Sequence, residues 1–87
     1  MARQTLVQRL LEQATNYPGG GYPTRVHILV GALSNISPSA LQGQFGLAAA
    51  GSVLEGVELV FHVVGDPQSP DALAVRVVDV DRVRDAS

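Results

Sequence analysis

The chain of 87 residues contains no cysteine, no lysine and no tryptophan. Without cysteine, neither a disulfide framework nor a thiolate zinc site can form, so zinc is not an expected cofactor. Without lysine, all six cationic side chains are arginines, and they are interspersed with eight acidic residues that give a net charge of −2. A basic patch that follows phosphates is hard to build from such a sequence, which argues against nucleic acid as a partner.

Long hydrophobic runs are also missing. No segment approaches the roughly 20 apolar residues that cross a membrane, and charged and amide side chains interrupt the stretch MARQTLVQRLLEQ where a signal peptide would be apolar. We therefore expect a cytoplasmic protein with no membrane partner. With 46% hydrophobic residues, residues 1–87 fit a single domain with a modest core, and pairing with a second copy stays open.

The first structured segment that the sequence indicates is an amphipathic helix over about residues 3–16. Its apolar residues recur at helical spacing, while arginine, glutamine and glutamate side chains occupy the opposite face. The stretch NYPGGGYP follows, in which Pro18 disfavours continuation of the helix and three glycines leave the backbone flexible. The apolar face of this helix comprises Leu6, Val7, Leu10, Leu11 and Ala14.

A strand is indicated next, over about residues 24–32, in the stretch TRVHILVGAL. Side chains alternate between the two faces of a strand, so Val26, Ile28 and Val30 share one face. We assign this valine face to the core.

A second helix is expected to begin behind the Ser-Pro pair and to run to about residue 50. Ser37 suits the capping position, and Pro38 suits the first turn, where its missing N–H costs nothing. Gly43 and Gly46 lie on one side of this helix. Either a neighbouring backbone approaches them closely, or packing elsewhere stabilises a helix of poor propensity.

Two further strands are expected over about residues 56–64 and 73–81, separated by the turn GDPQSPD. The short connection favours an antiparallel hairpin between them, and the adjacent Val77 and Val78 indicate a bulge in the second. The fold class is therefore α/β, an α+β two-layer sandwich in the order α-β-α-β-β, with two helices on one face of a three-stranded sheet.

The face of the sheet that the helices leave uncovered is a candidate docking surface. By alternation it carries the aliphatic side chains of Leu29, Val60 and Val64. Apolar residues mixed with charged ones can form a partner interface, whereas single exposed hydrophobic residues are also ordinary on protein surfaces. The polar residues predicted on the same face are Arg25, His27, Glu58 and His62.

In this order of elements, VHILVGALSNISPSAL and GSVLEGVEL resemble the HypA/HybF family of hydrogenase maturation nickel chaperones. The family pattern reads approximately V-x-L-x-I-G-x-L-S-x-V-x-P-x-x-L, followed by a phenylalanine and by G-T-x-x-E-G-A-x-L. The resemblance covers nearly the whole chain and implies two helices against a three-stranded mixed sheet, with the family's zinc domain deleted around residues 65–72. The matching residues are Val26, Ile28, Val30, Gly31, Leu33, Ser34, Ile36, Pro38, Leu41, Phe45, Gly51, Ser52, Glu55, Gly56 and Leu59.

The amino terminus departs from the family pattern. Family members begin Met-His-Glu and hold nickel through that histidine, whereas this chain begins Met1-Ala2-Arg3. An alanine in place of the imidazole leaves the amine of Met1 as a candidate ligand, and the cationic Arg3 opposes a metal ion. We therefore expect no family-type nickel binding and no required cofactor, although nickel itself stays open.

The resemblance also implies partners. Family members dock on the GTPase HypB and on the hydrogenase large subunit through surfaces at and near the first helix. The corresponding residues of this chain are Arg3, Gln4, Val7 and Gln8.

His27 and His62 are the remaining candidates for chemistry, because alternation places them on the same side of two strands. If those strands are neighbours in register, the two imidazoles would form half of a metal site, completed by Asp79 or Asp81. The alternatives are two half-exposed histidines without a ligand, or groups that make a partner interface depend on pH. No serine has a histidine at local motif spacing, so we do not expect an enzyme.

These observations favour a HypA-like accessory or docking protein of nickel–iron hydrogenase maturation or assembly, which acts by protein–protein interaction. One alternative is a nickel metallochaperone whose ligands have moved to His27 and His62. Another is a structural subunit of a hydrogenase or of a different complex.

Overall fold

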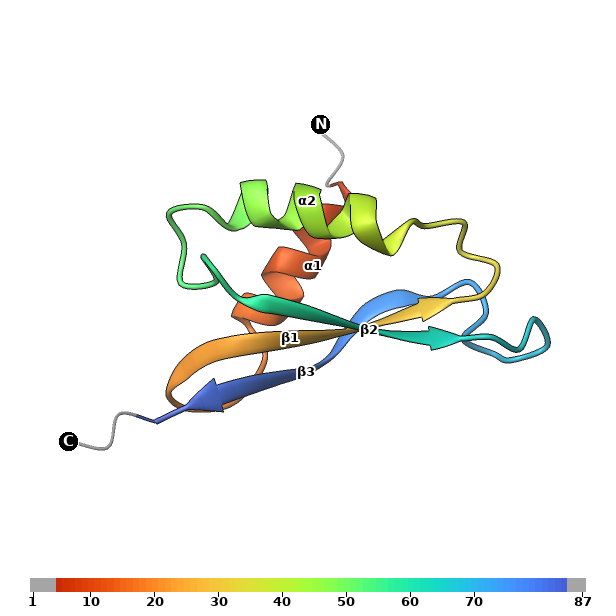
Figure 1. Ribbon diagram of the computed structural model, residues 1–87. Coiled ribbons are helices and arrows are strands. Elements are labelled where there is room, and N and C mark those ends of the chain that lie inside the picture. The colour runs from red at the N-terminus through yellow and green to blue at the C-terminus, as the bar shows by residue number, and fades with distance from the viewer. Residues whose placement is uncertain (1–4, 85–87) are drawn as a thin grey trace.

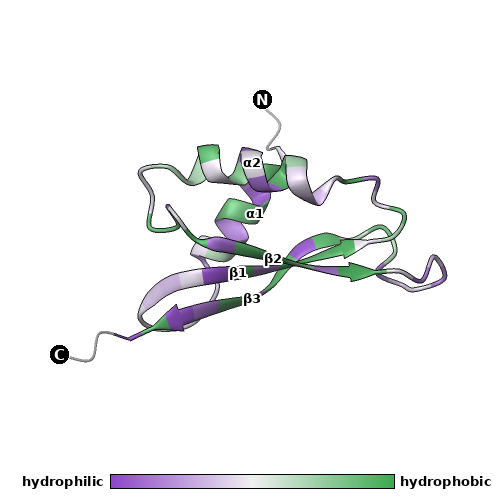
Figure 2. Ribbon diagram, in the orientation of Figure 1, coloured by the Kyte–Doolittle hydropathy of each residue, from purple (hydrophilic) through white to green (hydrophobic). Residues whose placement is uncertain are grey.

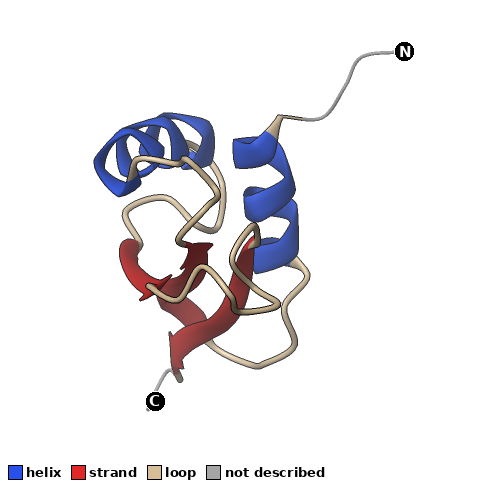
Figure 3. Ribbon diagram, turned by 90° about the vertical axis from the view of Figure 1, so that its right-hand side faces the viewer, coloured by secondary structure: helices blue, strands red, loops and turns tan. Residues whose placement is uncertain are grey.

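The computed structural model describes residues 5–84, which fold as two helices on one face of a three-stranded mixed sheet (Figure 1). Along the chain the elements are α1 (Leu6–Thr15), β1 (Tyr22–Gly31), α2 (Pro38–Ala49), β2 (Glu58–Val64) and β3 (Val75–Val83). The predicted fold class and order are confirmed. Figure 3 shows both helices on the same side of the sheet. No helix within residues 5–84 is long and apolar enough to cross a membrane.

Side-chain caps fix the start of each helix. At α1 the Thr5 amide donates to Gln8 Oε1 at 3.0 Å and the Gln8 amide donates to Thr5 Oγ1 at 3.1 Å, which forms a capping box. At α2 the Ser37 hydroxyl accepts from the Ala40 amide, and Pro38 is the first helical residue, as predicted. Both helices therefore begin at points that their local sequences define.

The core lies between the helices and the sheet. Leu10 of α1, Phe45 of α2, and Val26 and Ile28 of β1 are almost completely buried, and burial of each such side chain stabilises the fold by about 1.5–3 kcal/mol. Figure 2 shows hydrophobic segments, in green, on the strands and on both helices. The assignment of the valine face of β1 to the core is confirmed.

The strand order is β2-β1-β3, with β1 in the middle. β1 pairs in parallel with β2 and antiparallel with β3. The predicted hairpin between the last two strands is therefore wrong. Those strands run in opposite directions but are separated by β1, and residues 65–74 carry the chain across the end of β1.

Gly31, the last residue of β1, lies directly against this crossing connection. Its amide donates to the Ala74 carbonyl at 2.8 Å, and the Leu33 amide donates to the Ala72 carbonyl at 2.7 Å. A Cβ at position 31 would lie 2.2 Å from the Ala72 oxygen and 2.3 Å from the Asp71 oxygen. Only glycine leaves room for this approach of two backbones.

The bulge predicted at the adjacent valines of β3 is present. His27 pairs with Asp79 and the following residue, Ile28, pairs with Val77, so Val78 is the extra residue. Because the bulge shifts the alternation, Arg76 and Asp79 both pair with residues of the same β1 face.

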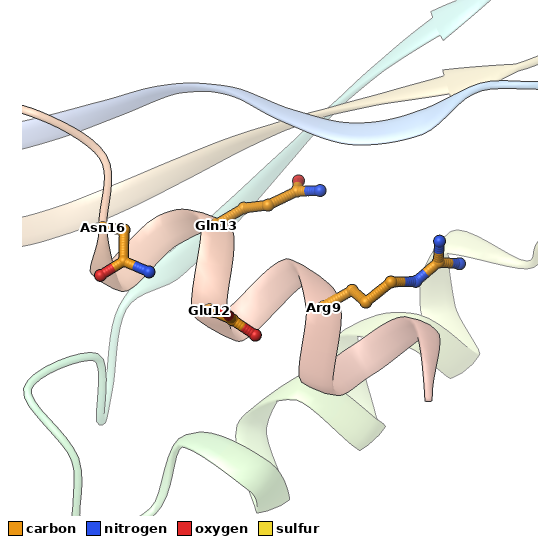
Figure 4. Close-up of a pocket in the computed structure, with 4 residues that line it drawn as sticks. All are labelled: Arg9, Glu12, Gln13 and Asn16. Atoms are coloured by element: carbon orange, nitrogen blue, oxygen red, sulfur yellow. The ribbon is translucent and has the colours of Figure 1, made fainter. Parts of the chain in front are cut away.

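Side chains of α1 and of the loop that follows it contact backbone groups of β3 at this bulge. The Val77 amide donates to Gln13 Oε1 at 2.9 Å, and the Tyr17 hydroxyl donates to the Val78 carbonyl at 2.9 Å. Figure 4 shows Gln13 reaching from α1 toward the sheet, beside a shallow hollow that it lines with Arg9, Glu12 and Asn16. These bonds satisfy backbone groups that an edge strand would otherwise leave open.

The two glycines of α2 have no packing role among the described residues. Apart from the neighbouring residues and the backbone of α2 itself, no described atom lies within 4 Å of a Cβ built at Gly43 or Gly46, and both residues are exposed. The idea of a close backbone approach there is wrong. Packing of Leu41 and Phe45 on the opposite side of α2 stabilises the helix instead.

Candidate functional site

The face of the sheet opposite the helices, called the open face below, is uncovered, as predicted. Leu29, Val60 and Val64 lie on it and are half-buried by their neighbours. Figure 3 shows the helices on one side of the sheet only. The polar residues that the strand register places on the open face are Arg25, His27, Glu58, His62, Arg76, Asp79 and Asp81.

His27 lies at the centre of the open face because β1 is the central strand. Its Nδ1 atom is 2.8 Å from His62 Nε2 on β2, and its Nε2 atom is 2.9 Å from Asp81 Oδ2 on β3. The His27 side chain is 17% exposed. The sequence argument required the two strands that bear the histidines to be neighbours in suitable register. The pairing of β1 with β2 meets this condition.

The two imidazoles face each other through ring nitrogens. Their centroids are 5.0 Å apart and their planes are inclined by 24°, and a 2.8 Å separation of nitrogens is too short for contact between ring faces. With neutral rings, Asp81 accepts the proton of His27 Nε2, so His27 Nδ1 accepts a hydrogen bond from His62 Nε2. The carboxylate thus sets the orientation and the tautomer of the central ring.

The charge on Asp81 is stabilised by its neighbours. The hydrogen bond from His27 is the largest effect and lowers the pKa of Asp81, burial is the second and raises it, and the electrostatic effects of His27 and Arg25 lower it by smaller amounts. The Arg25 Nε atom lies 3.7 Å from Asp81 Oδ2 and 3.5 Å from Glu58 Oε2. Both ion pairs are exposed and therefore weak, and the hydrogen bond from His27 contributes most to the ionised form of Asp81.

Asp79 adds a second carboxylate on the same face. Its Oδ1 atom accepts from the Val80 amide at 2.9 Å. One potential ligand atom each from His27, Asp79 and Asp81 lies within 4.8 Å of the other two. The sequence suggested one of these acids beside the histidines, and the structure brings both to His27.

The sequence also predicted a candidate ligand at Met1 and candidate partner contacts near the first helix. Met1, Arg3 and Gln4 lie outside the described residues. Val7 is 9% exposed and packs in the core, because the apolar face of α1 needs it there, and it also lines a hollow between α1 and α2. Gln8 is exposed and lines the same hollow with Leu47.

One polar contact near the open face was missed by the sequence argument. Arg76 Nη1 pairs with Asp71 Oδ1 at 3.0 Å, linking β3 to the connection that crosses β1. Regular alternation over residues 73–81 places position 76 with the core side, and only the bulge at Val78 brings it to the open face. The adjacent Val77 and Val78 were the signal in the sequence that indicated this change of face.

Comparison with known proteins gave no match: no family model, no curated protein and no solved structure is significantly similar to this chain.

Proposed function

We propose that this protein is a HypA-like accessory protein of nickel–iron hydrogenase maturation, which acts in the cytoplasm by docking rather than by catalysis. Its partner is a hydrogenase large subunit or a HypB-like GTPase. The docking surface is the open face, on which Val60 of β2 pairs with the central His27 of β1. The observation that carries this choice of surface is the position of both helices on the other side of the sheet.

The family resemblance supports the identity of the partners. The motif residues of VHILVGALSNISPSAL occupy β1, the following loop and the start of α2. The resemblance implies two helices against a three-stranded mixed sheet, and the chain has this architecture. A fold can serve many functions, so the sequence motif rather than the fold connects the chain to hydrogenase maturation.

The chemistry of the open face supports docking. Leu29, Val60 and Val64 provide aliphatic surface, and the polar groups around them are held in fixed positions by ion pairs and hydrogen bonds. Apolar surface with ordered charged groups at its margin is the composition of many transient protein interfaces. Arg25 toward one end and His62 toward the other give the surface groups that can recognise a partner's acidic side chains.

The test measures binding of the full chain to purified HypB-like GTPase and to purified hydrogenase large subunit, in precursor and mature forms. Biolayer interferometry suits this measurement. We expect at least one partner to bind, with preference for the precursor over the mature subunit. Val60→Glu should weaken binding at least tenfold, because it places a charge in the centre of the interface.

Matched variants separate the open face from other exposed apolar positions. Val53→Glu, on the 72% exposed side chain between α2 and β2, is the control and should leave binding unchanged. Leu47→Glu tests the hollow between the helices, where the side chain is 82% exposed. Binding lost with Leu47→Glu and kept with Val60→Glu would refute the open face as the docking surface. No binding to either partner would refute the hydrogenase role.

A further inference from the structure

We propose that the open face binds a first-row divalent metal ion of borderline character, such as Ni²⁺ or Co²⁺. The ligands are His27 Nε2 and one carboxylate oxygen each from Asp79 and Asp81. His62 holds the His27 ring from the other side. This inference goes beyond the docking role, because its ligands are His27, Asp79 and Asp81 rather than the aliphatic side chains that dock, and His62 alone belongs to both arguments.

The distances suit a common coordination sphere. At metal–ligand distances of about 2.0–2.2 Å, neighbouring ligand atoms in octahedral or tetrahedral geometry lie about 2.9–3.5 Å apart. His27 Nε2 and Asp81 Oδ2 already have this spacing, at 2.9 Å. The Asp79 ligand atom is within 4.8 Å of both, so rotation of an exposed side chain brings it to the ion without movement of the strands.

His62 is not a ligand itself but holds the ligand His27 by a hydrogen bond between their ring nitrogens. When an ion occupies Nε2 of His27, the ring proton resides on Nδ1, which then donates to His62 Nε2, 2.8 Å away. Ligand histidines generally donate their second ring N–H to a carboxylate, a carbonyl or water, which fixes the ring orientation, and His62 Nε2 is the acceptor available here. The His62 contact therefore has a role that two unrelated surface histidines would not have.

The donor types define the class of ion. One imidazole with two carboxylates suits first-row divalent ions of borderline character, whereas Mg²⁺ and Ca²⁺ prefer sites made of oxygen alone. The two carboxylates balance the charge of the ion. Three protein ligands leave positions for water or for a ligand from another molecule, unlike the closed four-ligand sites of structural zinc.

A rival set would place the ion between His27 Nδ1 and His62 Nε2, with Asp81 in the outer shell. It offers only two protein ligands, and Asp79 would have no part in it. Asp79 therefore distinguishes the two arrangements. Its side chain is exposed, so its replacement by asparagine should leave the fold intact.

The experiment titrates Ni²⁺ and Co²⁺ into the full chain by calorimetry and follows the visible absorption of Co²⁺. We expect one ion per chain with a dissociation constant in the micromolar range, and no binding of Mg²⁺. Asp79→Asn should weaken binding at least tenfold, and His27→Ala should abolish it. Glu58→Gln removes a negative charge from the same face without removing a ligand, and should change the affinity less than threefold.

Two outcomes would overturn the inference. Unchanged affinity in Asp79→Asn, combined with lost binding in His62→Ala, would assign the ion to the two imidazoles. A wild-type dissociation constant of a millimolar or weaker would exclude the site. Neither result would affect partner binding through Val60, so failure of the metal site and failure of the docking role are distinguishable.

Discussion

Replacement of Gly31 by alanine tests the packing that sets the strand order. The new methyl group would lie 2.2 Å from the Ala72 carbonyl oxygen, whereas ordinary contact begins at 3.4 Å. The connection between β2 and β3, residues 65–74, would have to move away by the difference of 1.2 Å or more. The obstructing atoms are backbone atoms, so a change of rotamer cannot relieve the contact.

The expected loss of stability follows from the contacts that this displacement disturbs. Overpacking in a buried site costs about 1–3 kcal/mol. The same movement lengthens the hydrogen bonds of the Gly31 and Leu33 amides to the connection, which are 2.8 and 2.7 Å long, and each contributes about 0.5–1.5 kcal/mol. We expect Gly31→Ala to lower the free energy of unfolding by about 2–4 kcal/mol.

Urea unfolding followed by far-ultraviolet circular dichroism measures this change, since the chain has no tryptophan for fluorescence. A loss of less than about 0.5 kcal/mol would show that the connection does not pack against the end of β1, because surface substitutions commonly have effects of that size. The proposed reason for the strand order would then be refuted.

Three further predictions use the same unfolding assay. Gly43→Ala should stabilise the protein by about 0.5–1 kcal/mol, because an exposed helical glycine with free space around it gains propensity; a loss would indicate a contact there. Gln13→Ala should cost about 1–2 kcal/mol by leaving the Val77 amide unpaired at the bulge, and a neutral effect would mean that water replaces the side chain. Asp81→Asn should destabilise the protein at neutral pH. Because folding lowers the pKa of Asp81, its contribution is complete above the ordinary carboxyl range. It is lost as pH falls through the folded-state pKa, below about pH 4. A difference between wild type and Asp81→Asn that persists at about pH 2 would contradict the assigned cause.

The local elements were predictable because their signals lie within a few residues of each other. Ser37 and Pro38 define the start of α2, and alternation in β1 separates Val26 and Ile28 from His27. The bulge of β3 was likewise visible in adjacent valines. Each of these features depends on backbone geometry that neighbouring residues determine.

The strand order was not predictable from the sequence of the connection between β2 and β3. GDPQSPD carries turn signals that serve a hairpin and a crossing equally well. The decision rests on contacts between residues far apart in the chain, namely the approach of residues 71–74 to Gly31 and the pairing of β2 with the free edge of β1.

The sequence by itself therefore determined the helices, the strands, the two faces of β1 and the pair of histidines as candidates. Only the tertiary structure decided that β1 is central, so that His27 lies between His62 on one neighbouring strand and Asp81 on the other. It also decided that Asp79 and Asp81 both approach the same imidazole. The physical reason is that local propensities fix the direction of each side chain along its own strand, whereas long-range packing fixes which strands are neighbours.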